Sequence, residues 1–458
     1  MKPRIGLVSF AWTADHPGGL RSHVVDLAHA LCDQGYAVFV HCVNTDPQAP
    51  LFETRSWIEN GIHVQELNYA YQDLQALPGF QCVDQAEVIL CEWVRYHQLQ
   101  LVDVHHTLYV GVRVLPVLSA LVPVVATLHD YWLLDPRGQL YGFASRPDGL
   151  LTDEAWEAGV RQTWPQAYEK SRFLARYFQA NQQLDPPSLM ARWQAFSRQC
   201  LASCQRLVAP SQAAASVFAA HGIESDLQVI ENGIDTDGIS AGLSREPPHP
   251  TPLPSRIRLG LLGHLVPSKG QLAFCEACLH PDLKGLIQLS LYGSIPDTYQ
   301  GDPAPQQRLQ AIIRSHPDWV AWHGPYRRDQ LASIFAAIDC LVMPSLWQEV
   351  YGLIAREALC YGLPLIVTNA GALADLAGRS RVFMLDADQP DRWAQALMAA
   401  LDEGPLFRWV YERRQRRMPS DAQVRTSAAC AAEVADLYQQ VLVGHPSSLL
   451  SAAAVSSS

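Results

Sequence analysis

Short apolar segments alternate with helix-forming segments along most of this 458-residue chain. A helix is predicted at residues 22–35, between the first two apolar segments. Short buried strands separated by helices are typical of a parallel sheet that helices cover on both faces. The first half of the chain therefore predicts an α/β domain. Its expected strands lie at residues 4–10, 36–43, 63–67, 101–105, 124–129 and 206–210.

The same alternation begins again after a segment that cannot form regular structure. Residues 246–254 hold five prolines in nine residues, which excludes them from helix interiors and central strands. We therefore predict two Rossmann-like parallel-sheet domains, at residues 1–245 and 257–405, joined by a linker at residues 246–256. The second series of expected strands lies at residues 257–262, 287–292, 319–323, 340–344, 363–368 and 381–385.

Two segments stand outside this alternation. Residues 132–200 are rich in Trp, Tyr and Arg and are expected to form a helical excursion between two strands of the first sheet. Residues 446–458 consist mostly of serine and alanine and are expected to be a disordered tail.

The composition excludes several classes of protein. A net charge of −11 argues against a nucleic-acid-binding protein. Eleven cysteines show neither metal-site nor disulfide spacing, which favours buried, reduced thiols. The apolar residues 110–128 include an arginine and two prolines, so we expect no membrane-spanning helix there. Because the chain opens directly with a strand, we expect no signal peptide and a cytoplasmic protein.

Residues 341–372 carry the strongest functional signal. A strand there ends at Pro344, a loop carries Glu349, and a helix that begins near Gly352 carries Glu357. The first backbone N–H groups of a helix have no partner within the helix and lie at the positive end of its dipole, so an anion can bind there. The two glutamates flank that position, and the arrangement suits a nucleotide-sugar diphosphate. The expected amides are those of Val350, Tyr351, Gly352 and Leu353.

A second predicted phosphate site follows the strand at residues 257–262. Gly263 at the strand end allows a phosphate to approach the backbone, and Lys269 supplies a positive charge. Gly270 follows the lysine, whereas a P-loop needs its lysine before a serine or threonine. A solvated loop lysine is the alternative interpretation.

Two segments of the first half are also candidates. Gly18 and Gly19 precede the first helix, where glycine lets a substrate pack against the chain, although a plain tight turn explains them equally well. His129 opens a His-Asp-Tyr-Trp segment at the end of a strand, the position where open α/β sheets bind ligands. A histidine whose hydrogen bonds are satisfied between domains is the alternative.

Together these segments resemble the retaining glycosyltransferases of family 4, which have the GT-B fold. Glu349 and Glu357 match the Glu-x7-Glu motif of that family, and residues 263–270 look like its element for the donor diphosphate. His264 stands where the family usually has an arginine. The resemblance implies two domains that face a central cleft, and a C-terminal helix, about residues 421–443, that crosses back to the first domain.

The resemblance also implies a function. It predicts transfer of a sugar, with retention, from a UDP- or GDP-linked donor to a saccharide or lipid-linked acceptor, in glycan or polysaccharide synthesis. His129 and Glu349 would be the catalytic residues, and Glu357 would hold the ribose. The loop that contacts the base would contain His323, Gly324 and Tyr326. The donor would be a co-substrate, and no further cofactor is expected.

The sequence also contains candidate metal-binding and membrane-binding segments. Asp235 and Asp237, and also Asp386 and Asp388, are interpreted as turn residues, and no ligand spacing surrounds His105 and His106, so no metal is expected. Residues 408–417, from Arg408 to Arg417, hold five arginines with interleaved aromatic residues. They favour a solvated helix face, with peripheral contact to the inner membrane surface as the alternative.

The sequence is also compatible with two other functions. The histidine at position 264 leaves room for a non-catalytic GT-B homologue that acts as a binding subunit. A nucleotide-sugar epimerase also combines Rossmann-like domains with a similar diphosphate.

Overall fold

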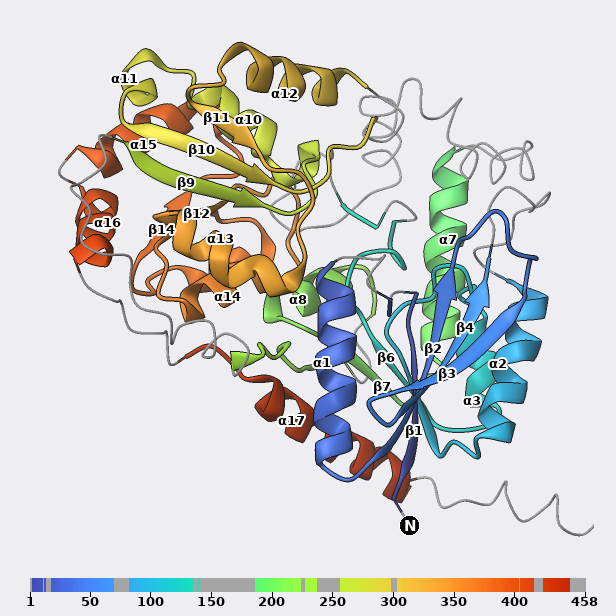
Figure 1. The fold of residues 1–458 in the computed structure, drawn as a ribbon. Helices are drawn as coiled ribbons and strands as arrows, with labels where there is room; N and C mark the ends of the chain where they lie inside the picture. The colour runs from blue at the N-terminus through green and yellow to red at the C-terminus, as the bar shows by residue number, and fades with distance from the viewer. Residues whose placement is uncertain are drawn as a thin grey trace, which may run out of the picture. The chain divides into compact units, whose positions relative to one another are not determined.

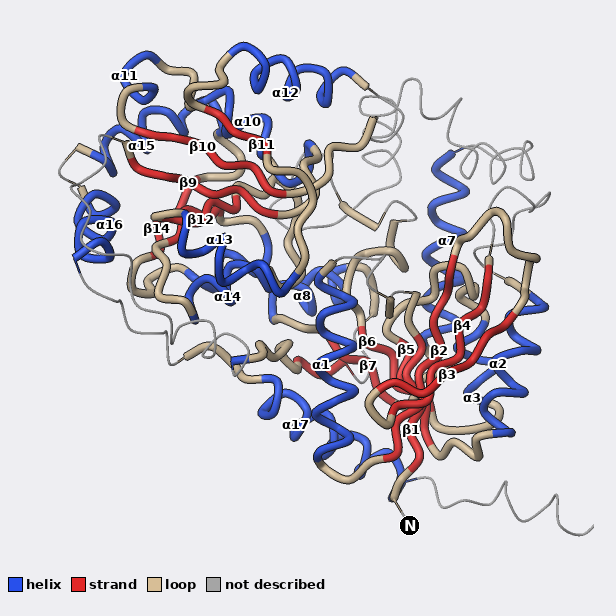
Figure 2. Tube along the Cα trace, in the orientation of Figure 1, coloured by secondary structure: helices blue, strands red, loops and turns tan. Residues whose placement is uncertain are grey.

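The computed structural model describes eleven segments of the chain, and they form two compact units (Figures 1 and 2). Unit 1 comprises the described residues of Met1–Gly138, Arg172–Gly233 and Arg425–Ser458, and unit 2 those of Gln139–Ser171 and Ile234–Val424. The predicted linker (except Arg256), the predicted tail and most of residues 132–200 lie outside the described residues. The structure describes residues 2–10, 12–13, 18–69, 82–135, 138–140, 186–223, 227–236, 256–297, 303–402, 404–415 and 423–444.

Unit 1 is built on an eight-stranded sheet with the order β3-β4-β2-β1-β5-β6-β7-β8. All neighbouring strands are parallel except β3 and β4. The sequence did not predict β3 or β8. The strands are β1 (Arg4–Val8), β2 (Ala37–Asn44), β3 (Thr54–Glu59), β4 (Ile62–Asn68), β5 (Leu101–Val104), β6 (Val124–Thr127), β7 (Arg206–Ala209) and β8 (Leu227–Val229).

One face of this sheet packs against α1 (Gly19–Asp33) and α17 (Ser427–Gly444), which lie side by side in Figure 1. Alternate residues of β1 and β2, such as Leu7 and Val40, join Tyr438 of α17 in one buried apolar cluster. The C-terminal helix thus belongs to unit 1, as the resemblance implies. Unit 1 also contains α2 (Asp84–Tyr96), α3 (Val114–Ser119), α7 (Pro186–Leu201) and α8 (Gln212–Ala220).

Unit 2 is built on a six-stranded sheet with the order β11-β10-β9-β12-β13-β14, and all its strand pairs are parallel. Two parallel α/β domains confirm the predicted fold class. The strands are β9 (Ile257–Leu262), β10 (Ile287–Tyr292), β11 (Val320–Trp322), β12 (Cys340–Met343), β13 (Leu365–Thr368) and β14 (Val382–Leu385).

Side-chain alternation explains why helices cover both faces of the second sheet. Val342 and Ile366 join one buried apolar cluster, whereas Leu341 and Val367, their neighbours in sequence, join another. Successive side chains of a strand point to opposite faces, so both faces of β12 and β13 are buried. The covering helices are α10 (Gln271–Ala277), α11 (Pro281–Lys284), α12 (Ala304–Ser315), α13 (Leu331–Ala337), α14 (Leu353–Cys360), α15 (Trp393–Leu401) and α16 (Pro405–Gln415).

The arginines of α16 divide between the interior and the surface of unit 2. Arg413 donates to the carbonyl oxygen of Phe335, and Arg414 donates to the buried carboxylate of Asp339, which also pairs with Arg258. Arg408 is exposed. At least two of the five arginines therefore hold unit 2 together, and peripheral membrane contact stays a prediction. Among the described helices, none combines the length and apolar character needed to cross a bilayer.

Candidate functional site

The candidate donor site of unit 2 centres on an ion pair between Lys269 and Glu349. Lys269 ends a 3-10 turn, η2 (Pro267–Lys269), and its Nζ lies 2.6 Å from Oε1 of Glu349. The same oxygen accepts hydrogen bonds from Ser345 Oγ at 2.6 Å and from Trp347 Nε1 at 2.8 Å. The ammonium group also lies 4.7 Å from the centre of the Trp347 ring. Three donors and a cation–π contact thus fix both charges.

The loops that carry these two residues meet because β9 and β12 are parallel neighbours, so their carboxyl ends lie at the same edge of the sheet. Glycine allows the loops to pack closely. A Cβ atom on Gly270, whose φ is 73°, would lie 1.8 Å from the carbonyl oxygen of Pro344. A Cβ atom on Gly371 would lie 2.3 Å from the carbonyl oxygen of Glu349. Any side chain at either position would separate the loops.

Helix α14 begins at Leu353, four residues after Glu349. Gly352 has a φ of 79°, a left-handed conformation that favours glycine, and turns the chain into the helix. Arg356 donates to the carbonyl oxygen of Tyr351 and stacks 3.8 Å from the centre of its ring, which fixes the loop before the helix. The backbone amides of residues 350–353, which lead into α14, therefore come directly after Glu349 in the sequence.

Glu357 lies on α14 with its carboxylate buried. Arg328 Nη2 lies 3.5 Å from Glu357 Oε1. Burial, and then the charge of Glu357, raise the pKa of both Tyr326 and Tyr361, so both tyrosines lie near the carboxylate. The structure thus brings together Glu357 and Tyr326, which the sequence placed in separate segments.

The predicted base-contacting loop follows β11. The imidazole of His323 stacks on Tyr292, with ring centres 4.5 Å apart and an interplanar angle of 12°. Gly324 has a φ of 77°, and its carbonyl oxygen accepts a hydrogen bond from the amide of Gly293 at 2.7 Å. The loop is thereby held to the end of β10.

His264 is exposed, and its Nδ1 lies 2.9 Å from Ser294 Oγ. Desolvation by neighbouring atoms and the positive charge of Lys269 lower its pKa. At neutral pH the imidazole is therefore uncharged, and it can supply a hydrogen bond but not the charge of an arginine. Gly263 precedes it with a φ of 117°.

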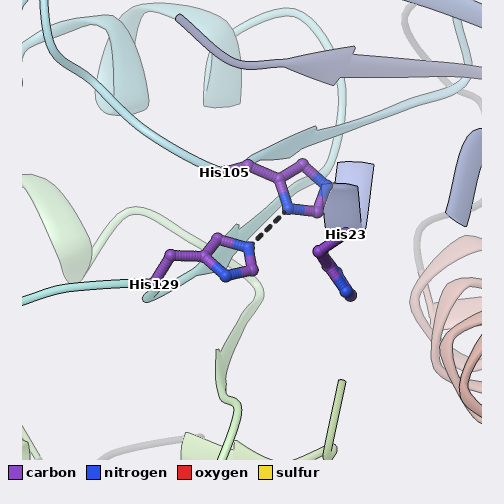
Figure 3. A group of neighbouring side chains, drawn as sticks. All are labelled: His23, His105 and His129. Carbon is purple, nitrogen blue, oxygen red and sulfur yellow. Dashed lines mark hydrogen bonds between the residues drawn. The ribbon is translucent and has the colours of Figure 1, made fainter. Parts of the chain in front are cut away.

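Unit 1 has a candidate site of its own at the carboxyl ends of β5 and β6. His129, half-buried, follows β6, and its Nε2 lies 2.9 Å from Nδ1 of His105, which follows β5 (Figure 3). Beside them, His106 Nε2 lies 2.9 Å from Asp130 Oδ2. A pocket at this edge is lined by residues that include His105, His106, His129, Asp130 and Trp132.

The remaining predicted residues lie in both units. Gly18 and Gly19 lie at the start of α1, and a Cβ atom on Gly18 would meet no atom within 4 Å, but its φ of 158° is one that other residues rarely adopt. Asp235 is described and Asp237 is not. Asp386 accepts hydrogen bonds from the amide of Asp388 and from Gln389 Nε2, as expected of a turn residue.

Several polar residues of the site were missed by sequence reasoning. Ser345 and Trp347 lie four and two residues before Glu349, and this proximity in the sequence was the signal that could have identified them. His23, on α1, lies with its ring centre 4.9 Å from that of His129, and Arg328 and Ser294 contact predicted residues from distant parts of the chain. No local pattern points to these contacts, because the fold alone creates them.

Comparison with known proteins gives two family matches in succession. Residues 17–237 match Glycosyltransferase Family 4, and residues 256–403 match Glycosyl transferases group 1. A protein named D-inositol 3-phosphate glycosyltransferase from Xylanimonas cellulosilytica is 25% identical, over 97% of this chain and 98% of its own. The protein of the same name from Streptomyces griseus is 30% identical, but over only 36% of this chain and 34% of its own.

Solved structures show the same fold. Sucrose-phosphate synthase from Thermosynechococcus elongatus has a TM-score of 0.67 and 18% identity, over 97% of this chain and 100% of its own. Anabaena Alr3699/HepE, solved in complex with UDP and glucose, has a TM-score of 0.57 and 16% identity, over 95% of this chain and 99% of its own. With both domain matches and this fold, the chain belongs to the GT-B glycosyltransferases of family 4.

Proposed function

We propose that this glycosyltransferase moves a sugar, with retention of configuration, from a UDP- or GDP-linked donor to a saccharide or lipid-linked acceptor, without a metal ion. The observation that carries the proposal is the Lys269–Glu349 pair beside the start of α14 in unit 2. It combines a cation, helix-start amides and a carboxylate with an available oxygen. A sugar attached to a diphosphate needs these three features.

The diphosphate would bind Lys269 and the first-turn amides of α14. A charge-assisted hydrogen bond from the ammonium and the positive end of the helix dipole both stabilise a leaving group whose negative charge grows as the sugar departs. His264 would add a neutral hydrogen bond. Lys269, these amides and His264 would together stabilise the negative charge of the diphosphate without a metal ion.

Glu349 would bind the donor sugar. Within the described residues, the three hydrogen bonds to its carboxylate all reach Oε1, which leaves Oε2 able to accept from a sugar hydroxyl. Glu357, oriented by Arg328, would accept hydrogen bonds from the ribose hydroxyls. The backbone of the loop at His323, Gly324 and Tyr326 would contact the base.

Transfer would proceed on one face of the sugar. The bond from the anomeric carbon to the diphosphate oxygen breaks as the acceptor oxygen bonds to that carbon on the same face, and the acceptor proton passes to the departing diphosphate. His129, which the resemblance assigns to the reaction centre, would donate or accept a hydrogen bond as a neutral imidazole.

A donor screen tests this proposal first. The full chain is titrated calorimetrically with UDP-, GDP- and ADP-sugars, and the selected donor is then incubated with saccharide, lipid-linked and inositol phosphate acceptors. Inositol phosphate is included because of the name of the curated relatives. The expected result is acceptor-dependent release of nucleoside diphosphate and, by NMR, an unchanged anomeric configuration.

The same experiment separates the alternatives. A binding subunit would bind a ligand without releasing nucleoside diphosphate, and an epimerase would change the sugar without an acceptor. An inverted product would contradict the retaining mechanism, and loss of transfer after treatment with a chelator would contradict metal independence.

A further inference from the structure

Three histidines from three separate elements meet in unit 1. His23 lies on α1, His105 follows β5 and His129 follows β6 (Figure 3). One ring nitrogen from each lies within 4.8 Å of the others, and the pair formed by His105 and His129 is 2.9 Å apart. Such convergence of imidazoles is the usual basis of a transition-metal site.

The parallel sheet explains how they meet. β5 and β6 are parallel neighbours, so His105 and His129 leave the sheet at the same edge. The first turns of α1 bring His23 to that edge, where its ring centre lies 4.9 Å from that of His129 and 5.7 Å from that of His105. The elements of unit 1 thus place all three histidines.

The hydrogen bond between His105 and His129 shows that a lone pair is present in the cluster. His105 Nδ1 and His129 Nε2 lie 2.9 Å apart, so one of these nitrogens donates and the other accepts. The accepting imidazole is therefore neutral, which is the form that binds a metal ion.

The hydrogen bonds of the cluster are incomplete. The His23 imidazole meets the cluster through ring contacts to His105 and His129. His105 Nε2 is buried without a partner within bonding distance, and Asp103 Oδ2 lies 3.6 Å from it. A metal ion at Nδ1, the nitrogen that faces His129, would let the carboxylate of Asp103 close on Nε2 and satisfy it.

Asp103 lies behind His105, where its carboxylate could orient the imidazole toward a metal ion. Thr127 Oγ1 donates to its Oδ1 at 3.0 Å, and Tyr438 donates to its Oδ2 at 2.7 Å, so the carboxylate is held behind His105. A carboxylate on one nitrogen of a histidine orients the other nitrogen toward a metal. Nδ1 of His105 faces His129, on the side opposite Asp103.

We propose that His23, His105 and His129 form a binding site for a divalent transition-metal ion, with Zn²⁺ as the best match. Three imidazole nitrogens and one open position suit Zn²⁺, whereas Mg²⁺ and Ca²⁺ require oxygen ligands. Tetrahedral bonds of about 2.0–2.1 Å place ligand nitrogens about 3.3 Å apart. Metal binding would therefore require side-chain rotations that bring nitrogens now up to 4.8 Å apart to that spacing. The adjacent pocket, which His105 and His129 line, leaves room for water as the fourth ligand.

The metal would act on transfer as an inhibitor and not as a cofactor. This consequence rests on the proposed function, because a metal on His129 occupies the lone pair that a substrate would use. The binding itself does not depend on that function. Experiments can therefore distinguish a failure of the metal site from a failure of the proposed transfer function.

The test is a Zn²⁺ titration of the full chain without a histidine tag, after treatment with a chelator, in competition with a chromophoric chelator. The expected stoichiometry is one ion per chain, and Co²⁺ should give the visible absorption of a tetrahedral complex. His23→Gln should weaken binding about 100-fold or more, because it removes a ligand. His41→Gln is the matched control, since His41 is also a fully buried histidine of unit 1 but bonds to Gln65 outside the cluster.

Two results would overturn the site: a wild-type chain that binds neither ion, or His23→Gln and His129→Gln variants that both bind as tightly as the wild type. The two variants are used together so that a folding failure of one leaves the other informative. Binding at the cluster without any loss of transfer would leave the site in place and would contradict the role proposed for His129.

Discussion

Nζ of Lys269 lies 2.6 Å from Oε1 of Glu349, although 80 residues separate them in the sequence. The two residues follow parallel neighbouring strands, and each neutralises the charge of the other. A bound diphosphate would share the lysine, while Ser345 and Trp347 would keep Glu349 in place. The site is therefore arranged before any donor arrives, which lowers the cost of binding.

Replacing Glu357 tests the ribose contact. Glu357→Gln should weaken nucleoside diphosphate binding about 10-fold, because a hydrogen bond to a charged acceptor contributes about 1.5–3 kcal/mol. Calorimetry measures the change, and Glu276→Gln, at a surface ion pair with Arg308, is the control. Unchanged affinity in Glu357→Gln would exclude the ribose role.

Replacing His264 tests the departure from the family pattern. Because the pKa of His264 is lowered, the wild-type imidazole contributes no charge at pH 7. His264→Arg should therefore strengthen nucleoside diphosphate binding by about 3- to 10-fold, since guanidinium is always protonated. Titrations at low salt measure this gain, and an equal or weaker affinity would mean that residue 264 does not face the phosphates.

Acid should destabilise unit 1 through its buried histidines. The folded pKa of His23 is lowered to about 3, so its contribution to stability is complete above its unfolded pKa near 6.5 and is lost as the pH falls toward 3. Asp103, whose pKa burial raises to about 7, contributes in the opposite sense, because its stabilisation is present below about 3.8 and is lost as the pH rises toward 7.

The difference between two proteins isolates the histidine contribution. Between pH 6 and pH 4, the unfolding free energy of the wild type should fall more steeply than that of His23→Gln, by about 1.4 kcal/mol per pH unit for one proton. Urea unfolding of the full chain at several pH values measures both slopes. Equal slopes would show that His23 titrates normally in the folded state.

The C-terminal helix should depend on one buried hydrogen bond. Tyr438→Phe removes the donor to Asp103 and should lower the unfolding free energy by about 1–3 kcal/mol. Tyr36→Phe is the matched control, because the Tyr36 hydroxyl only reaches the backbone oxygen of Ala435 at 3.3 Å. Urea unfolding should show the smaller loss in the control, and the reverse order would contradict this assignment.

The sequence predicted the two sheets well because each buried strand is a short apolar run. Ile257–Leu262 and Ile287–Tyr292 were found to the residue. Strand β3 (Thr54–Glu59) was missed because it is largely exposed and polar, and β8 (Leu227–Val229) was missed because it has only three residues.

The site was only partly predictable, for a physical reason. Lys269, Glu349 and Glu357 could be predicted because each stands in a local sequence motif that can be recognised without knowledge of the fold. The contacts of Arg328 with Glu357, and of His23 with His129, join segments far apart in sequence. They exist because parallel strands end at one edge, and no local spacing encodes them.

The most direct test of the account is calorimetric titration of Lys269→Met with the nucleoside diphosphate that the donor screen selects. Methionine has about the length of lysine but removes the charge, the hydrogen bond to Glu349 and the cation–π contact with Trp347. Lys284→Met, on the short helix α11, is the control. Diphosphate binding by Lys269 predicts about 10- to 100-fold weaker binding in Lys269→Met and unchanged binding in the control. Equal affinity in Lys269→Met and the wild type would contradict the claim that this lysine binds the diphosphate.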